Sequence, residues 1–189
     1  MALWLILAVV AVVLVYAIVA YNSVVRTRQM ANEAWSGIDV QLKRRSELVP
    51  NLVDTVKGYA AHERSVLEEV TERRGAARAL PEGAVAARGE AEGALSAALG
   101  RLLALAENYP DLKASDNFLQ LQQQLSGLEN ELQMARRYYN GTVRNLNVLV
   151  QSFPSNLIAG LLGFRVRDFF ELGEGEGALP QVDLGTRRP

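Results

Sequence analysis

The side chains best able to do chemistry in this chain gather in residues 41–63, in the stretch QLKRRSELVPNLVDTVKGYAAHE. It holds a basic run from Lys43 to Arg45, the one histidine of the chain, His62, and a carboxylate beside it, Glu63. Such groups can bind an anion, ligate a metal ion or exchange a proton near neutral pH. The stretch is therefore either a site or a charged structural helix.

The catalytic patterns that could use these residues are incomplete. His62 opens the sequence HERSV, which lacks the second histidine of the zinc-protease helix motif. A di-iron bundle needs two Glu-x-x-His pairs, and a single histidine cannot supply them. The sequence has no glycine-rich phosphate loop, and without cysteine it has no thiolate ligand, cysteine nucleophile or disulfide. We therefore predict no catalytic residue, no metal site, no cofactor and no enzyme activity.

The overall charge argues against a nucleic-acid-binding protein. The chain has 189 residues with 20 basic and 21 acidic side chains, which gives a net charge of −1. No basic block exceeds three residues, so the sequence lacks the basic footprint that a nucleic-acid surface requires. The length suits one domain with a sizeable core.

An uncharged apolar segment, ALWLILAVVAVVLVYAIVA, runs from Ala2 to Ala20. Its length matches a bilayer-spanning helix. A cleaved signal peptide is the competing interpretation, but signal peptides carry basic residues before a shorter apolar run of about 7–15 residues. We therefore predict that residues 1–21 form a retained transmembrane anchor, with the lipid bilayer as a partner.

The charges that flank this segment predict its orientation. Only the α-amino group precedes it, whereas Arg26 and Arg28 follow it closely. Basic residues favour the cytoplasmic side of a membrane. We therefore expect a single-pass protein of the cell (inner) membrane whose C-terminal part is cytoplasmic.

After the anchor, one register of mostly apolar positions recurs at alternating steps of three and four, a heptad-like pattern typical of coiled coils and helical bundles. Its members are Trp35, Ile38, Leu42, Arg45, Val49, Leu52, Val56, Tyr59, Glu63, Val66 and Val70. The register keeps its phase across Pro50, so we predict one continuous helix from the anchor to about Ala79, kinked at that proline.

Two members of this seam, Arg45 and Glu63, are charged. They lie 18 positions apart, about 27 Å along a helix, so they cannot pair with each other within one helix. Because an unpaired buried charge is costly, we expect each to find a partner on another helix or another chain, and to act as a structural polar seam.

Three further segments complete the predicted fold. A second helix spans about Glu82 to Asn108 and a third about Asp116 to Ser152. The apolar seam of the third passes unbroken through Asn140-Gly141, a pair that read alone would suggest a hairpin turn. A short fourth segment covers 155–172. We predict an all-α protein in which a single transmembrane helix continues into an antiparallel, up-and-down four-helix bundle, 22–172, followed by a disordered tail, 173–189.

The stretch YNSVVRTRQMANEAWSGIDVQLKRRSELVPNLVDTVKGYAAHE strongly resembles the signature of the LemA family. The later ARRYYNGTVRNLNVLVQSFPSNLIAGLLGF, followed by FFEL, resembles the C-terminal half of the same family. The resemblance covers nearly the whole chain after the anchor, except the alanine-rich region 75–100 and the tail. It implies a bacterial single-pass membrane protein with a helical-bundle domain, and it implies no enzyme activity.

Two functions remain open. The first is a membrane-anchored scaffold or assembly protein that acts through helix–helix contacts with an unknown protein partner. The second is a metal or small-molecule sensor, or an unrecognised enzyme, that uses the polar region of Arg45, His62 and Glu63.

The expected helix lengths also suggest self-association. The second helix is expected to fold back no further than about residue 53, and the third to head away from the membrane again from that level. The packing stripe of the first helix at Trp35, Ile38 and Leu42 would then be exposed. Exposed apolar stripes usually mark an interaction surface, and we predict a homo-oligomer that uses these residues. The alternative is that segment 155–172 runs back and covers the stripe within the monomer.

Overall fold

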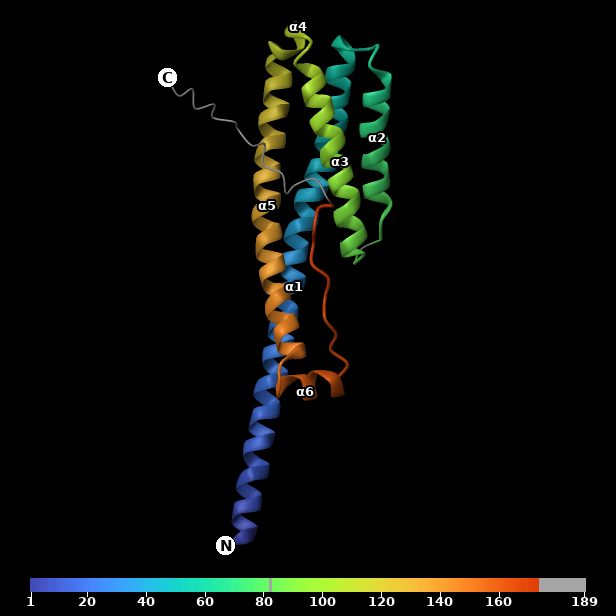
Figure 1. Cartoon of the computed structure of the whole chain (residues 1–189). Coiled ribbons are helices and arrows are strands. Elements are labelled where there is room, and N and C mark those ends of the chain that lie inside the picture. The colour runs from blue at the N-terminus through green and yellow to red at the C-terminus, as the bar shows by residue number, and fades with distance from the viewer. Residues whose placement is uncertain (82, 174–189) are drawn as a thin grey trace, which may run out of the picture. The chain divides into compact units, whose positions relative to one another are not determined.

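The structure, a computed structural model, describes residues 1–81 and 83–173, and within these ranges every regular element is helical (Figure 1). The elements are α1 (Ala2–Tyr59), α2 (Arg64–Ala79), α3 (Val85–Ala106), α4 (Pro110–Lys113), α5 (Asp116–Gln151) and α6 (Ser155–Leu161). The predicted all-α fold, with an apolar N-terminal helix and a helical bundle, is confirmed. The tail predicted at 173–189 lies outside the described residues, apart from Gly173.

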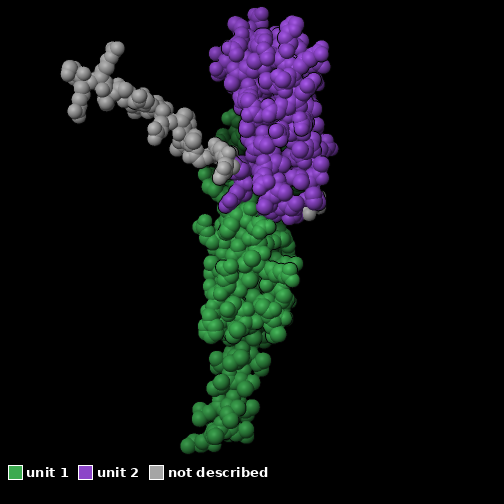
Figure 2. All heavy atoms as spheres, turned by 45° about the vertical axis from the view of Figure 1, so that its right-hand side comes forward, with its two compact units in different colours: residues 1–47, 123–170 green, residues 48–122, 171–189 purple. Residues whose placement is uncertain are grey.

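The chain divides into two compact units (Figure 2). Unit 1 contains residues 1–47 and 123–170, and unit 2 contains residues 48–122 and 171–189. Helices α1 and α5 each contribute to both units. The boundaries expected from the sequence between anchor, bundle and tail stay predictions.

Unit 2 is an up-and-down arrangement of four helical segments: the end of α1, then α2, α3 and the first turns of α5 (Figure 1). Each segment buries apolar side chains in a common core. They are Leu52, Val56, Leu67, Val70, Leu95, Leu99, Leu102 and Phe118, and Leu112 of α4 is buried as well. On the surface, the Arg101 guanidinium of α3 forms two hydrogen bonds with the Glu69 carboxylate of α2, one of them at 3.2 Å from Nε.

The first helix ends twenty residues earlier than predicted. Helix α1 stops at Tyr59, a turn follows, and α2 begins at Arg64 and runs back antiparallel to the end of α1 within unit 2 (Figure 1). The prediction of one helix to about Ala79 is therefore wrong. Gly58 weakens the last turn of α1 because glycine costs about 1 kcal/mol in a helix. Folding back then lets α2 bury Leu67 and Val70 in the core of unit 2.

Pro50 lies inside α1, and the helix continues past it, as the phase of the seam predicted. Proline has no N–H for the bond to the carbonyl four residues earlier, which is that of Ser46. The apolar residues on both sides, Val49 and Leu52, are fully buried, so packing holds the helix together across the missing bond. The kink itself stays a prediction.

Unit 1 pairs the N-terminal part of α1 with the remainder of α5 in antiparallel fashion (Figure 1). Its core is a single stripe on each helix: Ala20, Val24, Ala31, Ile38 and Leu42 on α1, and Leu132, Tyr139, Val143 and Leu146 on α5. Before Ala20 the side chains of α1 are exposed to the surroundings, and this apolar part extends alone from the green unit in Figure 2. It is long and apolar enough to cross a membrane.

The chain reverses direction after α5. The short helix α6 is followed by Gly163, whose φ of +73° is accessible to glycine at little cost. From Phe164 to Phe170 the chain has no regular secondary structure and runs back along unit 1 (Figure 1). We call residues 164–170 the returning segment.

Within unit 2, the chain that follows the returning segment lies very close to the N-terminal half of α3. A Cβ atom on Gly89 would collide with the backbone oxygen of Glu171, and one on Gly93 would lie 2.8 Å from the backbone nitrogen of Gly173. Two glycines four residues apart therefore leave α3 without side chains where this backbone crosses it.

We predict that Gly89→Ala destabilises the chain by about 1–2 kcal/mol, because overpacking against a backbone outweighs the better helix propensity of alanine. The matched control is Gly100→Ala on the same helix, where a new Cβ meets nothing within 4 Å. It should stabilise by up to about 1 kcal/mol. Thermal unfolding of the detergent-solubilised chain, followed by circular dichroism, measures both. Equal shifts in the same direction would show that residues 171–173 do not pack on α3.

Candidate functional site

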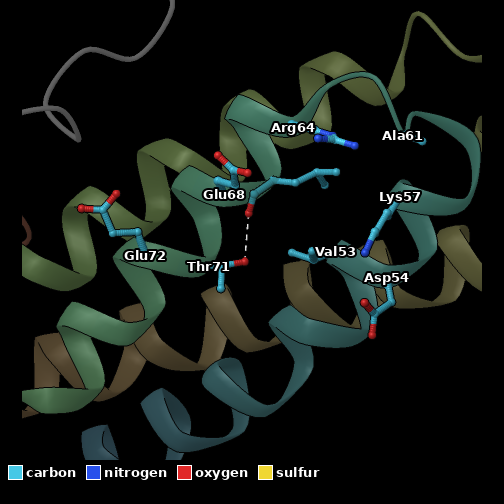
Figure 3. A pocket seen from close by; sticks show the side chains of 9 residues that line it. Val53, Asp54, Lys57, Ala61, Arg64, Glu68, Thr71 and Glu72 are labelled. Carbon is cyan, nitrogen blue, oxygen red and sulfur yellow. Dashed lines mark hydrogen bonds between the residues drawn. The ribbon is translucent and has the colours of Figure 1, made fainter.

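A groove of about 770 Å³ opens in unit 2 between the end of α1 and α2 (Figure 3). Side chains from the last turns of α1, from the turn after it and from the outer face of α2 line it. They are Val53, Asp54, Lys57, Ala61, Arg64, Leu67, Glu68, Thr71 and Glu72.

The lining of the groove is apolar at its base and charged at its edges. Val53 and Leu67 are half-buried and buried, respectively, and the charged residues among the lining are exposed. Lys57 and Arg64 lie near the turn, whereas Glu68 and Glu72 follow one and two turns further along α2 (Figure 3). This combination suits the side of a protein segment that has both apolar and charged residues, as in helix-in-groove recognition.

The groove offers little for catalysis. The hydroxyl of Thr71 donates a hydrogen bond to the carbonyl of Leu67 at 2.9 Å, which occupies it within α2 (Figure 3). His62 is exposed in the turn between α1 and α2 and does not line the groove. No cluster of three or more His, Cys, Asp or Glu side chains suited to a metal ion occurs within residues 1–81 and 83–173.

Arg45 lies inside unit 1 and is 1% exposed. Its Nε atom is 3.1 Å from Oε1 of Glu129 on α5. The neighbouring basic residues also meet acids, since Lys43 lies 2.6 Å from Asp39 and Arg44 lies 3.8 Å from Glu131. The basic run therefore forms ion pairs both within α1 and between α1 and α5.

Glu63 lies in the turn and is the residue that precedes α2, so it does not occupy a continuous helical seam as predicted. Its Oε1 atom accepts a hydrogen bond from the hydroxyl of Tyr109, at 3.2 Å. Desolvation and the hydrogen bond to this carboxylate raise the pKa of the Tyr109 hydroxyl, which stays a donor. The contact links the α1–α2 turn to the start of α4.

The alternative site of Arg45, His62 and Glu63 is not assembled within either unit. Arg45 belongs to unit 1, whereas His62 and Glu63 belong to unit 2. The two latter residues are adjacent in sequence, but Glu63 is engaged by Tyr109 and His62 faces the surroundings.

The stripe expected to be exposed at Trp35, Ile38 and Leu42 is covered within unit 1. Ile38 and Leu42 are buried, and Trp35 packs its ring 5.5 Å from that of Tyr139 and 5.6 Å from that of Phe170. The premise of an uncovered stripe is therefore wrong. Helix α5 runs back along this part of α1, and the returning segment, which belongs to the alternative segment 155–172, reaches it as well. A homo-oligomer stays a prediction, but an exposed stripe at these residues no longer supports it.

Two asparagines of α5 hold the returning segment, and the sequence analysis missed this role. Asn147 donates to the carbonyl of Arg167 at 2.9 Å and accepts from its N–H at 2.8 Å. Asn140 likewise donates to the carbonyl of Phe170 at 3.0 Å and accepts from its N–H at 2.9 Å. The side-chain amides thus pair with the returning backbone as a neighbouring strand would. The signal in the sequence is two asparagines seven residues apart on one helix face.

Tyr139 adds a third link between α5 and the returning segment. Its hydroxyl donates a hydrogen bond to the carbonyl of Asp168, at 3.0 Å. Burial raises the pKa of Tyr139, and the nearby Arg167 and Asp168 act on it in opposite directions. The hydroxyl therefore keeps its proton, and its donor role, at neutral pH.

Comparisons with known proteins give one family and several relatives. A family model described as the LemA family matches residues 34–184. Magnetosome protein MamQ of Magnetospirillum gryphiswaldense is 26% identical over 189 residues, covering 86% of this chain and 70% of that protein. Magnetosome protein MamQ 2 of Paramagnetospirillum magneticum is 27% identical, covering 80% and 64%. Protein LemA of Metamycoplasma hominis is 27% identical over 165 residues, covering 87% and 73%.

We predict that Asn140→Ala releases the returning segment, because it leaves both backbone groups of the buried Phe170 unpaired, at a cost of about 2–3 kcal/mol. Trypsin should then cleave after Arg165 and Arg167 about tenfold faster, which a digestion time course measures. Asn145→Ala, at an exposed position of the same helix, is the matched control and should leave cleavage unchanged. Equal cleavage rates for both variants would show that Asn140 does not hold the returning segment.

A second prediction concerns the buried ion pair. Glu129→Leu should destabilise the chain by about 2–3 kcal/mol, because Arg45 then stays buried without this carboxylate. The expected loss is smaller than for a fully buried pair, because the Glu129 side chain is partly exposed. The double variant Arg45→Met/Glu129→Leu should recover most of that loss, since it removes both charges. Thermal unfolding of Glu129→Leu, Arg45→Met and the double variant measures the interaction. If the losses of the two single variants add up to the loss of the double variant, the two side chains do not interact.

Proposed function

The chain belongs to the LemA family, and from this premise we propose that it is a membrane-anchored scaffold that holds a partner protein through helix–helix contacts. The role is one of binding and assembly, without a catalytic step.

The observation that carries this proposal is the double character of α1. Its first part is apolar on all sides and exposed, which fits a lipid environment. Its last turns contribute Val53, Asp54 and Lys57 to the groove of unit 2. One continuous helix therefore carries both an anchor and one wall of a docking surface.

The chemistry of the groove indicates the kind of partner. An amphipathic helix would place apolar side chains against Val53 and Leu67 and would meet exposed charges at the edges. Such a helix would carry acidic residues toward Lys57 and Arg64, and basic residues toward the Glu72 end of the groove. Charge pairs at a rim mainly select orientation and partner.

The relatives agree with an assembly role. The names of the MamQ relatives assign those proteins to the magnetosome and not to a reaction. We carry over to this chain only the idea that a member of the family can serve as a component of a larger cellular structure.

The flanking charges support a location and an orientation. Arg26 and Arg28 follow the apolar segment, and both are exposed. By the positive-inside rule, the chain that follows the apolar segment would lie on the cytoplasmic side of the cell membrane.

A photoreactive amino acid at the exposed groove residue Glu68 should crosslink to a protein partner in native membranes. The same probe at Ala97, exposed on α3 and outside the groove lining, is the matched control. We expect a specific adduct at Glu68 alone. A second change, Glu72→Lys, should lower its yield by about threefold or more, because it reverses one rim charge. Equal adducts at both positions, or no effect of the charge reversal, would contradict the groove as the docking surface.

A further inference from the structure

Helix α6 buries its small residues and exposes its large apolar residues, the reverse of an ordinary surface helix. The residues turned toward unit 1 are the small Ser155 and Ala159, which are buried. The residues on the other face are Leu157 and Leu161, which are 63% and 86% exposed. Ordinary surface helices bury their leucines and expose small or polar residues.

Neighbouring residues extend this exposed apolar surface. Phe153, just before α6, is 80% exposed, and Leu162 and Val166, just after it, are also exposed. We call Phe153, Leu157, Leu161, Leu162 and Val166 the interfacial patch. An exposed cluster of large apolar side chains marks a contact with a protein, a ligand or a membrane.

The position of this patch along α1 indicates which contact it makes. The ring of Phe164 lies 6.1 Å from that of Tyr21, the residue that directly follows the apolar segment. It also lies 6.0 Å from the guanidinium carbon of Arg28, which is about 10 Å further along the helix. The connection after α6 therefore meets α1 directly after the apolar segment.

Basic side chains gather at the same level. A cavity of about 260 Å³ in unit 1 is lined by Arg28, Arg165 and Arg167, with Leu146 and residues 163, 164 and 166, and by no acidic residue. Arg167 is fixed by the two backbone bonds to Asn147, so its position is set by α5. Three arginines among the residues that line one small cavity suit a phosphate group.

We propose that this end of unit 1 is a second membrane contact, in which the interfacial patch inserts into the bilayer surface and Arg28, Arg165 and Arg167 bind the headgroup of an anionic phospholipid. The proposal rests on the proposed anchor, which brings the patch to the bilayer. An apolar face beside basic residues is the combination by which helices bind anionic membrane surfaces.

The absence of cysteine allows a direct test, since one introduced thiol is the only labelling site. Full-length Leu161→Cys, labelled with an environment-sensitive fluorophore, is reconstituted into vesicles that contain brominated lipids as contact quenchers. Met134→Cys, exposed on α5, is the control outside the membrane. Val10→Cys, in the apolar segment, is the control within it.

We expect strong fluorescence quenching of the label in Val10→Cys and in Leu161→Cys, and none in Met134→Cys. Quenching at position 10 without quenching at position 161 would overturn the second contact and leave the anchor intact. No quenching at position 10 would overturn the anchor, and with it the scaffold at the membrane.

The headgroup is tested with the Leu161→Cys label at equal mole fractions of brominated phosphatidylglycerol or brominated phosphatidylcholine. We expect at least about threefold preferential quenching by the anionic lipid. Arg28→Gln/Arg165→Gln/Arg167→Gln should abolish this preference, whereas Arg137→Gln, exposed on α5 and outside the cavity, should retain it. Loss of the preference on adding inorganic phosphate at low millimolar concentration would assign the cavity to a soluble anion and overturn the lipid proposal.

Discussion

With the proposed anchor in a bilayer, one helix, α1, has to satisfy two different surroundings. A segment inside a bilayer must meet all its backbone hydrogen-bonding needs internally, which a helix does, and it can be apolar on every side. Once the same helix leaves the lipid, only one stripe can stay apolar, and that stripe must be covered. Burial along α1 begins at Ala20 and Val24, directly after the uncharged segment. From there on, α5 and the returning segment of unit 1 cover that stripe.

Helix α5 covers one side of the stripe in unit 1, and the returning segment covers the other. The returning segment has no secondary structure of its own, so its backbone polar groups need partners from elsewhere. Asn140 and Asn147 supply them, and Phe170 then fills the space beside Trp35. The same fixed segment carries Arg165 and Arg167 to the level of Phe164 and Arg28. Packing of the stripe and the arrangement of the basic cavity thus depend on the same few hydrogen bonds.

The sequence predicts the long helices well, because apolar periodicity reports one-sided burial directly. Helix α5 was expected at 116–152 and occupies Asp116–Gln151, straight through Asn140-Gly141. The end of α1 could not be located in the same way. Val66 and Val70 keep the phase of the earlier seam, but a helix that folds back can show the same spacing as one that continues. Only the contacts of α2 with α3 distinguish the two cases.

The parts of the candidate sites that the sequence did not reveal depend on contacts between distant segments. The groove lies between the end of α1 and α2, which run antiparallel. The sequence predicts α2 as a continuation of α1 in one helix, so it could not predict the groove. The asparagine pairing is invisible to periodicity because the segment it holds, 164–170, is neither helix nor strand. The charged Arg45 was visible on its seam, yet periodicity alone could not choose its partner Glu129 over Asp116 and Glu131, the other two acids of α5.

The proposed membrane location depends most on residues 1–21 holding the chain in a bilayer. Alkaline extraction of membranes from cells that express the full chain tests this directly, compared with a chain that begins at Asn22. We expect the full chain to stay in the membrane pellet and the shortened chain to lose that resistance to extraction. Release of the full chain into the supernatant would contradict it.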